Sequence, residues 1–116
     1  MVESLVHEPP KNWLRGVLEP CLLALLSSDE RYGYELSALL AEAGLGTVPG
    51  GSLYPALLRL EKGGLISSKW KAGDGGPGRK YYRLTGQGAN QLTHNADEWK
   101  RFSNSVQRIL EQEGRP

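Results

Sequence analysis

The stretch GGSLYPALLRLEKGGLISSKWKAGDGGPGRKYYRLT, residues 50–85, decides the fold of this 116-residue chain. Its first part predicts a short helix with Ser52 as the N-cap and Pro55 in the first turn. A serine hydroxyl satisfies free N–H groups there, and a proline gives up only an N–H that has no helical partner. Gly63 and Gly64 end this helix. Apolar residues recur at three and four positions, the spacing of one helix face: Leu53, Ala56, Leu57 and Leu60.

A two-stranded hairpin is expected to follow, with strands from Ile66 to Ala72 and from Arg79 to Leu84. The intervening GDGGPG, residues 73–78, is too rich in glycine and proline for regular structure and predicts the tip. Residues 51–84 carry seven Lys/Arg and two Asp/Glu, whereas residues 1–50 carry three and seven. A basic helix and hairpin suit a polyanion such as DNA. A lysine-rich face that merely contacts water is the alternative.

Length and composition predict one small domain without a cofactor. The chain has no apolar run of 18 residues and its first residues do not form a secretory signal, so we expect a cytoplasmic protein without a membrane span. The single cysteine, Cys21, lies in an apolar helical run and is expected to pack in the core.

His94, with Asp97 and Glu98 at helical spacing, lacks further metal ligands. No catalytic set can be assembled either, so neither a metal site nor an enzyme is predicted.

The remaining segments complete a winged helix-turn-helix over residues 13–84, preceded by an extended arm over residues 1–12. The first helix is expected from Trp13 to Ser27 and the second from Tyr32 to Ala43, followed by the connector GLGTVPG. The order is therefore helix, connector, helix and basic hairpin, which is typical of a winged helix-turn-helix. In such a domain the second helix of the pair enters the major groove. Two sets of residues are expected on helix faces. Leu36, Leu39, Leu40 and Ala43 face inward, whereas Glu35 and Glu42 face out; Trp13, Gly16, Pro20 and Leu23 form a second apolar face of the first helix.

Thr85 is expected to cap a long helix over residues 85–116 that runs to about Glu113. Its apolar residues repeat at intervals of four and three, as in a coiled-coil seam with one polar gap at Ser103. The members of this seam are Leu92, Ala96, Trp99, Ser103, Val106 and Leu110, widened by Phe102 and Ile109. So small a domain leaves little surface to cover this seam, which favours a two-fold symmetric homodimer. The alternative is a helix that folds back on its own core.

Three motifs resemble the PadR family of bacterial transcriptional regulators: YGYELSALL at 32–40, GSLYPALLRLEKGGLI at 51–66 and RKYYRLT at 79–85. They occur in the family's order and spacing, and the resemblance covers about residues 14–110. The short chain is similar to the subgroup with a single C-terminal helix. The resemblance implies a mainly helical winged helix-turn-helix with a two-stranded wing. It also implies a homodimeric repressor that binds a pseudo-palindromic operator in double-stranded DNA.

The resemblance carries DNA contacts over to particular positions. Ser52 and Tyr54 match the DNA-facing side of the recognition helix, and Tyr34 matches a phosphate contact of the preceding helix. Together with Arg59, a cation of the recognition helix, and the basic wing positions, the predicted DNA-binding residues are Tyr34, Ser52, Tyr54, Arg59, Lys69, Lys71, Arg79 and Lys80. A winged-helix module that binds an acidic protein instead of DNA is the alternative function.

Some relatives in this subgroup bind planar aromatic compounds between the subunits, against a tryptophan of the last helix. Trp99 matches that position and Trp13 matches a pocket-lining position of the first helix. Indole faces suit planar or cationic aromatic compounds. The predicted ligand-binding residues are Trp13, Gly16, Pro20, Trp99 and Ser103. The resemblance thus implies a small aromatic effector that modulates DNA affinity, whereas on the alternative view Trp99 is only a seam residue.

Overall fold

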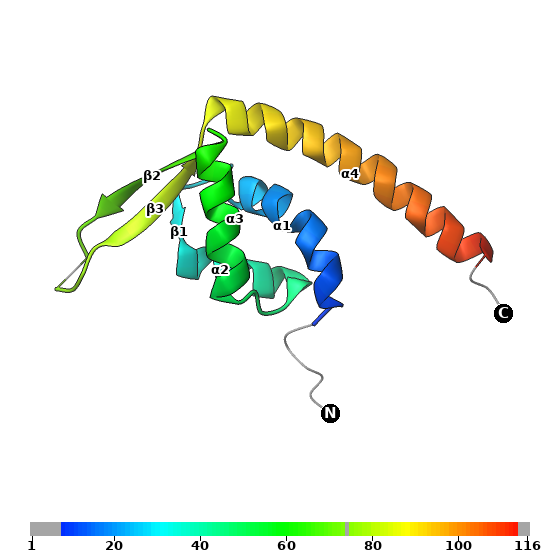
Figure 1. The fold of residues 1–116 in the computed structure, drawn as a ribbon, viewed down its shortest axis with the longest axis horizontal. Helices are drawn as coiled ribbons and strands as arrows, with labels where there is room; N and C mark the ends of the chain where they lie inside the picture. Colours follow the sequence, from blue (N-terminus) through cyan, green and yellow to red (C-terminus); the bar gives the residue numbers. More distant parts are fainter. Residues whose placement is uncertain (1–7, 74, 114–116) are drawn as a thin grey trace.

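A computed structural model describes residues 8–73 and 75–113 of the protein. Three helices form a core that carries a small antiparallel sheet on one side, and a long fourth helix crosses the core and extends beyond it (Figure 1). The helices are α1 (Lys11–Leu25), α2 (Gly33–Leu40), α3 (Gly50–Lys62) and α4 (Gly86–Glu113), and the strands are β1 (Arg31–Tyr32), β2 (Ile66–Lys71) and β3 (Arg79–Leu84). The fold is therefore the predicted winged helix-turn-helix with a long C-terminal helix.

The core is built mainly from leucine side chains of the first three helices. Leu22 and Leu23 of α1, Leu36 of α2 and Leu57 of α3 are fully buried, and the sheet closes the core with Ile66. All four residues of the predicted apolar face of α3 are buried: Leu53, Ala56, Leu57 and Leu60. Burial of Leu23 corrects its assignment to a second apolar face of α1, because this side chain belongs to the core.

Helix α3 begins earlier than the sequence predicts. Pro49 is its N-cap, and the Pro49 carbonyl accepts hydrogen bonds from the backbone N–H groups of Ser52 and Leu53 at 2.9 and 3.0 Å. Ser52 is therefore not the N-cap and makes no capping hydrogen bond. Pro55 consequently lies in the second turn, where its ring removes the N–H that would pair with the Gly51 carbonyl.

The second predicted helix is divided into three parts. Arg31 and Tyr32 form β1, which pairs with Tyr82 and Tyr81 of β3, so the sheet has three strands in the order β1-β3-β2. After α2 the chain makes a wide helical turn over Ala41–Leu45, where Gly44 has φ of 100°, and Ala43 is exposed there. The expected inward position of Ala43 is therefore wrong.

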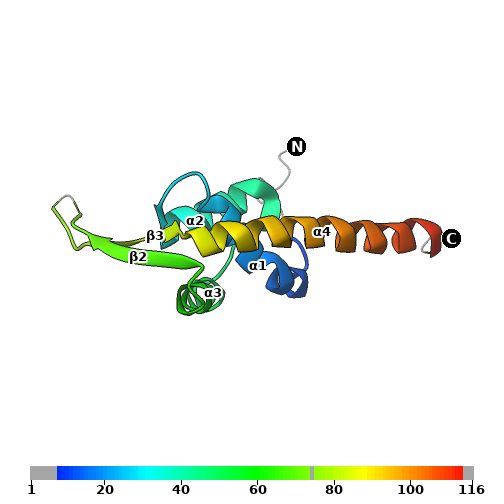
Figure 2. The same ribbon diagram turned by 90° about the horizontal axis from the view of Figure 1, so that it is seen from above.

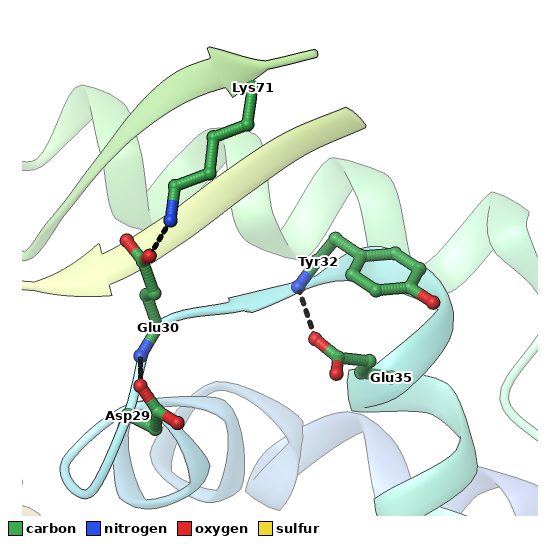
Figure 3. Close-up of polar contacts among 5 residues, drawn as sticks. All are labelled: Asp29, Glu30, Tyr32, Glu35 and Lys71. Carbon is green, nitrogen blue, oxygen red and sulfur yellow. Dashed lines mark hydrogen bonds and ion pairs between the residues drawn. The ribbon is translucent and has the colours of Figure 1, made fainter. Parts of the chain in front are cut away.

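A hydrogen bond at the start of α2 explains why the helix does not begin at Tyr32. The Tyr32 backbone N–H donates to the Glu35 carboxylate at 3.1 Å, so a side chain from the first turn of α2 reaches back to the N-cap residue (Figure 3). Glu35 is half-buried in this role and does not simply face solvent as expected. The cap leaves Tyr32 in an extended conformation, free to pair with Tyr81 as a sheet residue.

Thr85 caps α4 as the sequence predicts. Its hydroxyl oxygen accepts a hydrogen bond from the Gly88 N–H at 3.0 Å, while the hydroxyl lies 2.7 Å from the Gly64 carbonyl oxygen in the turn after α3. The first half of α4 packs on α1, but the second half extends away from the core, on the side opposite to the β2–β3 hairpin (Figures 1 and 2). Within the described residues, only the first half therefore folds back on its own core.

The first helix begins at Lys11 rather than at Trp13 and runs without a break through Pro20 to Leu25. Of the predicted N-terminal arm, residues 1–7 lie outside the described part of the chain. Just before α1, the Glu8 carboxylate accepts a hydrogen bond from the Thr47 N–H at 3.2 Å. The end of the arm therefore lies beside the connector between α2 and α3.

Candidate functional site

The β2–β3 hairpin, which we call the wing, has two chemically different faces. Strand register places Lys69 opposite Tyr81 and Lys71 opposite Arg79, and directly paired residues share a face. Tyr32 of β1 joins them, with its ring centroid 5.3 Å from that of Tyr81. We call this the tyrosine face, and it comprises Tyr32, Lys69, Lys71, Arg79 and Tyr81.

The opposite side, the α3 face of the wing, comprises Ser68, Trp70, Lys80 and Tyr82. Glu61 of α3 reaches this face, since the Ser68 hydroxyl donates to its carboxylate and the Lys80 ammonium lies 3.5 Å from it. Burial raises the pKa of the Tyr82 phenol, and the negative charge of Glu61 adds to the shift. Tyr82 is thus a neutral core residue that braces the base of the wing.

Three of the five predicted DNA-binding lysines and arginines already form ion pairs with carboxylates of the protein. Arg59 lies 2.7 Å from Glu19 of α1, Lys80 contacts Glu61, and Lys71 pairs with Glu30 just before β1 (Figure 3). Sequence reasoning missed these acidic partners because they lie far from the lysines and arginine along the chain. The wing's charge is therefore smaller than a count of its lysines and arginines indicates.

Lys69 and Arg79 make no ion pair with any described residue, and both are exposed. The Arg79 guanidinium lies 4.6 Å from the centroid of the Tyr32 ring, a cation–π arrangement that fixes its position without neutralising its charge. Among the predicted DNA-binding cations, Lys69 and Arg79 are therefore the best placed to meet a polyanion.

The predicted contacts on α2 and α3 divide into exposed and braced side chains. Tyr34 is 74% exposed, and Ser52 is exposed in the first turn of α3. Tyr54 is half-exposed, but its ring lies against Gly33 of α2, where an added Cβ would lie 2.8 Å from Tyr54 Cε1. The Tyr54 ring therefore holds α3 against α2, and only part of it faces outward.

A cleft of about 750 Å³ lies between α1 and α4. It gathers four of the five predicted ligand-binding residues, Trp13, Gly16, Pro20 and Trp99, and adds Phe102, which sequence reasoning placed only in the seam. The ring centroids of Trp99 and Phe102 lie 6.2 Å apart. Ser103 does not line the cleft, and its hydroxyl lies 3.3 Å from the Lys100 carbonyl oxygen.

Cys21 also lines this cleft, and burial raises the pKa of its thiol. The thiol therefore stays protonated at neutral pH, which makes it a poor nucleophile. Within residues 8–73 and 75–113, no three His, Cys, Asp or Glu side chains gather as metal ligands. The helices of that same part of the chain lack the combined length and apolar character needed to cross a bilayer.

Comparison with known proteins identifies the family. The model for the transcriptional regulator PadR-like family matches residues 22–94, which include α2, α3 and the whole wing. The chain belongs to the PadR family. This PadR protein is a DNA-binding transcriptional regulator and not an enzyme.

Solved structures of PadR regulators superpose over most of the chain. A PadR-like transcriptional regulator from Bacillus cereus is 44% identical, with a TM-score of 0.75 over 85% of this chain and 96% of that chain. A PadR family regulator from Eggerthella lenta is 34% identical, with a TM-score of 0.78 over 88% of each chain. An uncharacterised protein from Lysinibacillus sphaericus is 30% identical over 84% of this chain and 92% of its own length. The family model and these similarities thus extend into α4.

Proposed function

We propose that this PadR regulator is a cytoplasmic repressor that binds a pseudo-palindromic operator as a two-fold symmetric homodimer. The observation that carries the proposal is the placement of Lys69 and Arg79, exposed and without an ion-pair partner among the described residues, on a wing next to α3. In helix-turn-helix proteins the second helix of the pair enters the major groove. The wing cations then meet the flanking phosphates.

Hydroxyl groups are expected to set the position of the protein on the duplex. Tyr34 and Ser52 project from the N-terminal turns of α2 and α3, and both are exposed. Hydroxyls and backbone N–H groups position phosphates but carry little base information. Few side chains on this surface are long enough for bidentate base contacts, so the operator is read partly through its shape.

The part of α4 from Trp99 onward supports the homodimer. Five apolar side chains there are exposed in the single chain: Trp99, Phe102, Val106, Ile109 and Leu110. Their spacing is that of a coiled-coil seam, and so large an exposed apolar strip marks an interface. A second copy of the chain covers each strip with an identical one.

The cleft between α1 and α4 supports an aromatic effector. Its Trp13 and Trp99 indoles offer broad apolar faces, and the two-fold axis of the proposed dimer brings two such clefts together. A planar aromatic compound bound there changes DNA affinity if it prefers one arrangement of the two subunits. Quenching of Trp99 fluorescence by such a compound is expected, and unchanged binding by Trp99→Ala would exclude stacking on this residue.

Duplex binding across a salt series tests the DNA-binding proposal. A duplex selected from random sequence is titrated by fluorescence anisotropy with the wild-type protein and with Lys69→Ala, Arg79→Ala and Lys100→Ala. The logarithm of the binding constant is expected to fall linearly with the logarithm of salt concentration. Lys69→Ala and Arg79→Ala each weaken binding and flatten the slope by about 1. Lys100 lies on α4, so its substitution is the charge-matched control.

Binding that ignores salt, or equal affinities for all four proteins, would contradict the proposed interface. A selection that yields no preferred duplex, together with capture of an acidic protein through the wing, would favour the protein-interaction module instead.

A further inference from the structure

Trp70 of β2 has no role in the core or the cleft. Its side chain is 71% exposed, whereas the other two tryptophans both line the cleft between α1 and α4. An exposed indole keeps a large apolar surface in water, which costs free energy unless a partner covers it. Lys69 and Arg79 of the wing make no ion pair with a described residue, so a partner that covers Trp70 also lies near positive charge that no carboxylate neutralises.

Strand register determines which way Trp70 points. Trp70 pairs with Lys80, and alternation along β2 places it on the same face as Ser68. Ser68 and Lys80 both contact Glu61 of α3, so this is the face of the wing that meets the recognition helix. Trp70 lies two residues closer to the tip than Ser68, about 7 Å farther along the strand. The indole is therefore on the α3 side, just beyond the end of the α3 contact.

The surroundings of the indole restrict its partner. Lys69 and Lys71 flank it in sequence, and Lys80 lies opposite. A Cβ added to Gly78 would lie 3.8 Å from Trp70 Cε3, so the ring rests beside bare backbone at the root of the tip. Lys80 is paired with Glu61, and Lys69 and Lys71 point to the opposite face of the wing. A rigid apolar ring on a wing that also carries the cations Lys69 and Arg79 complements the sugar–phosphate edge of a duplex, which offers apolar deoxyribose between anionic phosphates.

We propose that Trp70 is a DNA-contacting residue that packs on deoxyribose at the edge of the minor groove next to the major groove occupied by α3. The inference rests on the proposed function. Apolar side chains at minor-groove steps respond to groove width and deformability rather than to the base code. Trp70 thus contributes to DNA affinity through apolar contact that does not depend on salt concentration. Lys69 and Arg79, on the opposite face of the wing, contribute the part of the affinity that falls as salt is added.

Substitution of Trp70 separates the apolar contribution from the charged one. Trp70→Ala is expected to weaken binding to the selected duplex by roughly ten- to a hundredfold, from the loss of one buried aromatic side chain. The salt slope stays unchanged, whereas Lys69→Ala flattens it by about 1. Trp70→Phe retains a ring and recovers part of the affinity. Because the indole is exposed in the free protein, the melting temperature of Trp70→Ala matches that of the wild type, which excludes unfolding as the cause.

Fluorescence gives an independent readout of the contact. A Trp13→Phe/Trp99→Phe variant leaves Trp70 as the remaining tryptophan. Titration with the duplex is expected to shift its emission and protect it from acrylamide, with saturation at the same duplex concentration as anisotropy. The wild-type protein is titrated with the same duplex by anisotropy in parallel. If the two substitutions in the cleft alter DNA binding, this comparison reveals it.

The possible results distinguish the inference from the function on which it rests. If the wild type binds the duplex and Trp70→Ala binds it equally well, the inference is overturned and the proposed function stands. If the wild type binds no duplex, both fail. If Trp70→Ala sediments as a single chain but each chain binds the duplex as tightly as a wild-type chain does, the indole contacts a second protein chain instead of DNA. That result also overturns the inference.

Discussion

At the scale of single residues, carboxylates next to the wing limit its attraction for DNA. Glu30 pairs with Lys71 (Figure 3). The Lys71 ammonium also lies 4.7 Å from the centroid of the Tyr81 ring. A phosphate that approaches Lys71 must therefore compete with Glu30 for it. The carboxylate also repels the phosphates that flank the site.

Glu30→Gln is therefore expected to tighten DNA binding. The amide keeps the shape of the side chain but releases Lys71, so the slope of the logarithm of the binding constant against that of salt steepens by up to about 1. Glu42→Gln, at an exposed acid in the turn after α2, is the control for net charge. Equal gains in both variants, measured by anisotropy, would mean that only overall charge matters.

At the scale of elements, the start of α4 fixes the long helix to the wing and to the end of α3. Thr85 bonds to the turn after α3, and Gly88 lies so close to that turn that an added Cβ would overlap the Leu65 carbonyl oxygen and lie 2.8 Å from Leu84 Cδ1. Backbone cannot move aside as a flexible side chain does. Gly88 is thus required for the close approach of α4 to the domain.

Gly88→Ala is expected to lower the free energy of unfolding by about 3 kcal/mol, the upper end of the cost of overpacking. Gly86→Ala is the matched control in the same turn, since its Cβ would meet nothing within 4 Å. It leaves stability unchanged or slightly higher, because alanine forms helix better than glycine. Urea denaturation followed by circular dichroism measures both, and equal midpoints would refute the tight contact.

The same elements indicate what sequence patterns predict well here. The buried face of α3 and the cap and extent of α4 follow from periodicity and from Thr85, because these signals are local. The start of α3 does not, since the N-cap residue is Pro49, which makes no side-chain capping hydrogen bond and so gives no capping signal in the sequence. Strand β1 was also missed, because only two residues pair with β3 and the Glu35 cap decides where α2 begins.

The two candidate sites differ in what the sequence reveals of them. Trp13 and Trp99, which the family resemblance assigned to a ligand pocket, do line one cleft, and their role as ligand contacts stays a prediction. The pairing of Arg59 with Glu19 depends instead on how α1 packs against α3, across forty residues of sequence. Contacts of that kind are decided by tertiary packing and leave no signal in the spacing of residues.

At the scale of the whole molecule, the wing and the second half of α4 extend from opposite sides of the core (Figures 1 and 2). This arrangement separates the wing, which we propose faces DNA, from the apolar strip of α4. In the proposed dimer, α4 sets the distance between the two wings. Subunit contacts and operator binding should therefore change together.

Ile109→Lys is expected to disrupt the dimer, because it places a charge in the apolar strip of α4, where Ile109 is 61% exposed in the single chain. Sedimentation at micromolar concentration should give the mass of one chain. Asn104→Lys introduces the same charge at another exposed position of α4 and should leave the dimer intact. A dimer that survives Ile109→Lys would exclude this strip as the interface.

The central claim is that two chains bind one operator duplex together. Sedimentation equilibrium of the wild-type protein with a duplex that carries a single selected site measures the stoichiometry directly. The mass of two chains per duplex is the predicted result, and Ile109→Lys should lose most of its affinity for the same duplex. One chain per duplex bound with full affinity, or no complex with any selected duplex, would contradict the claim.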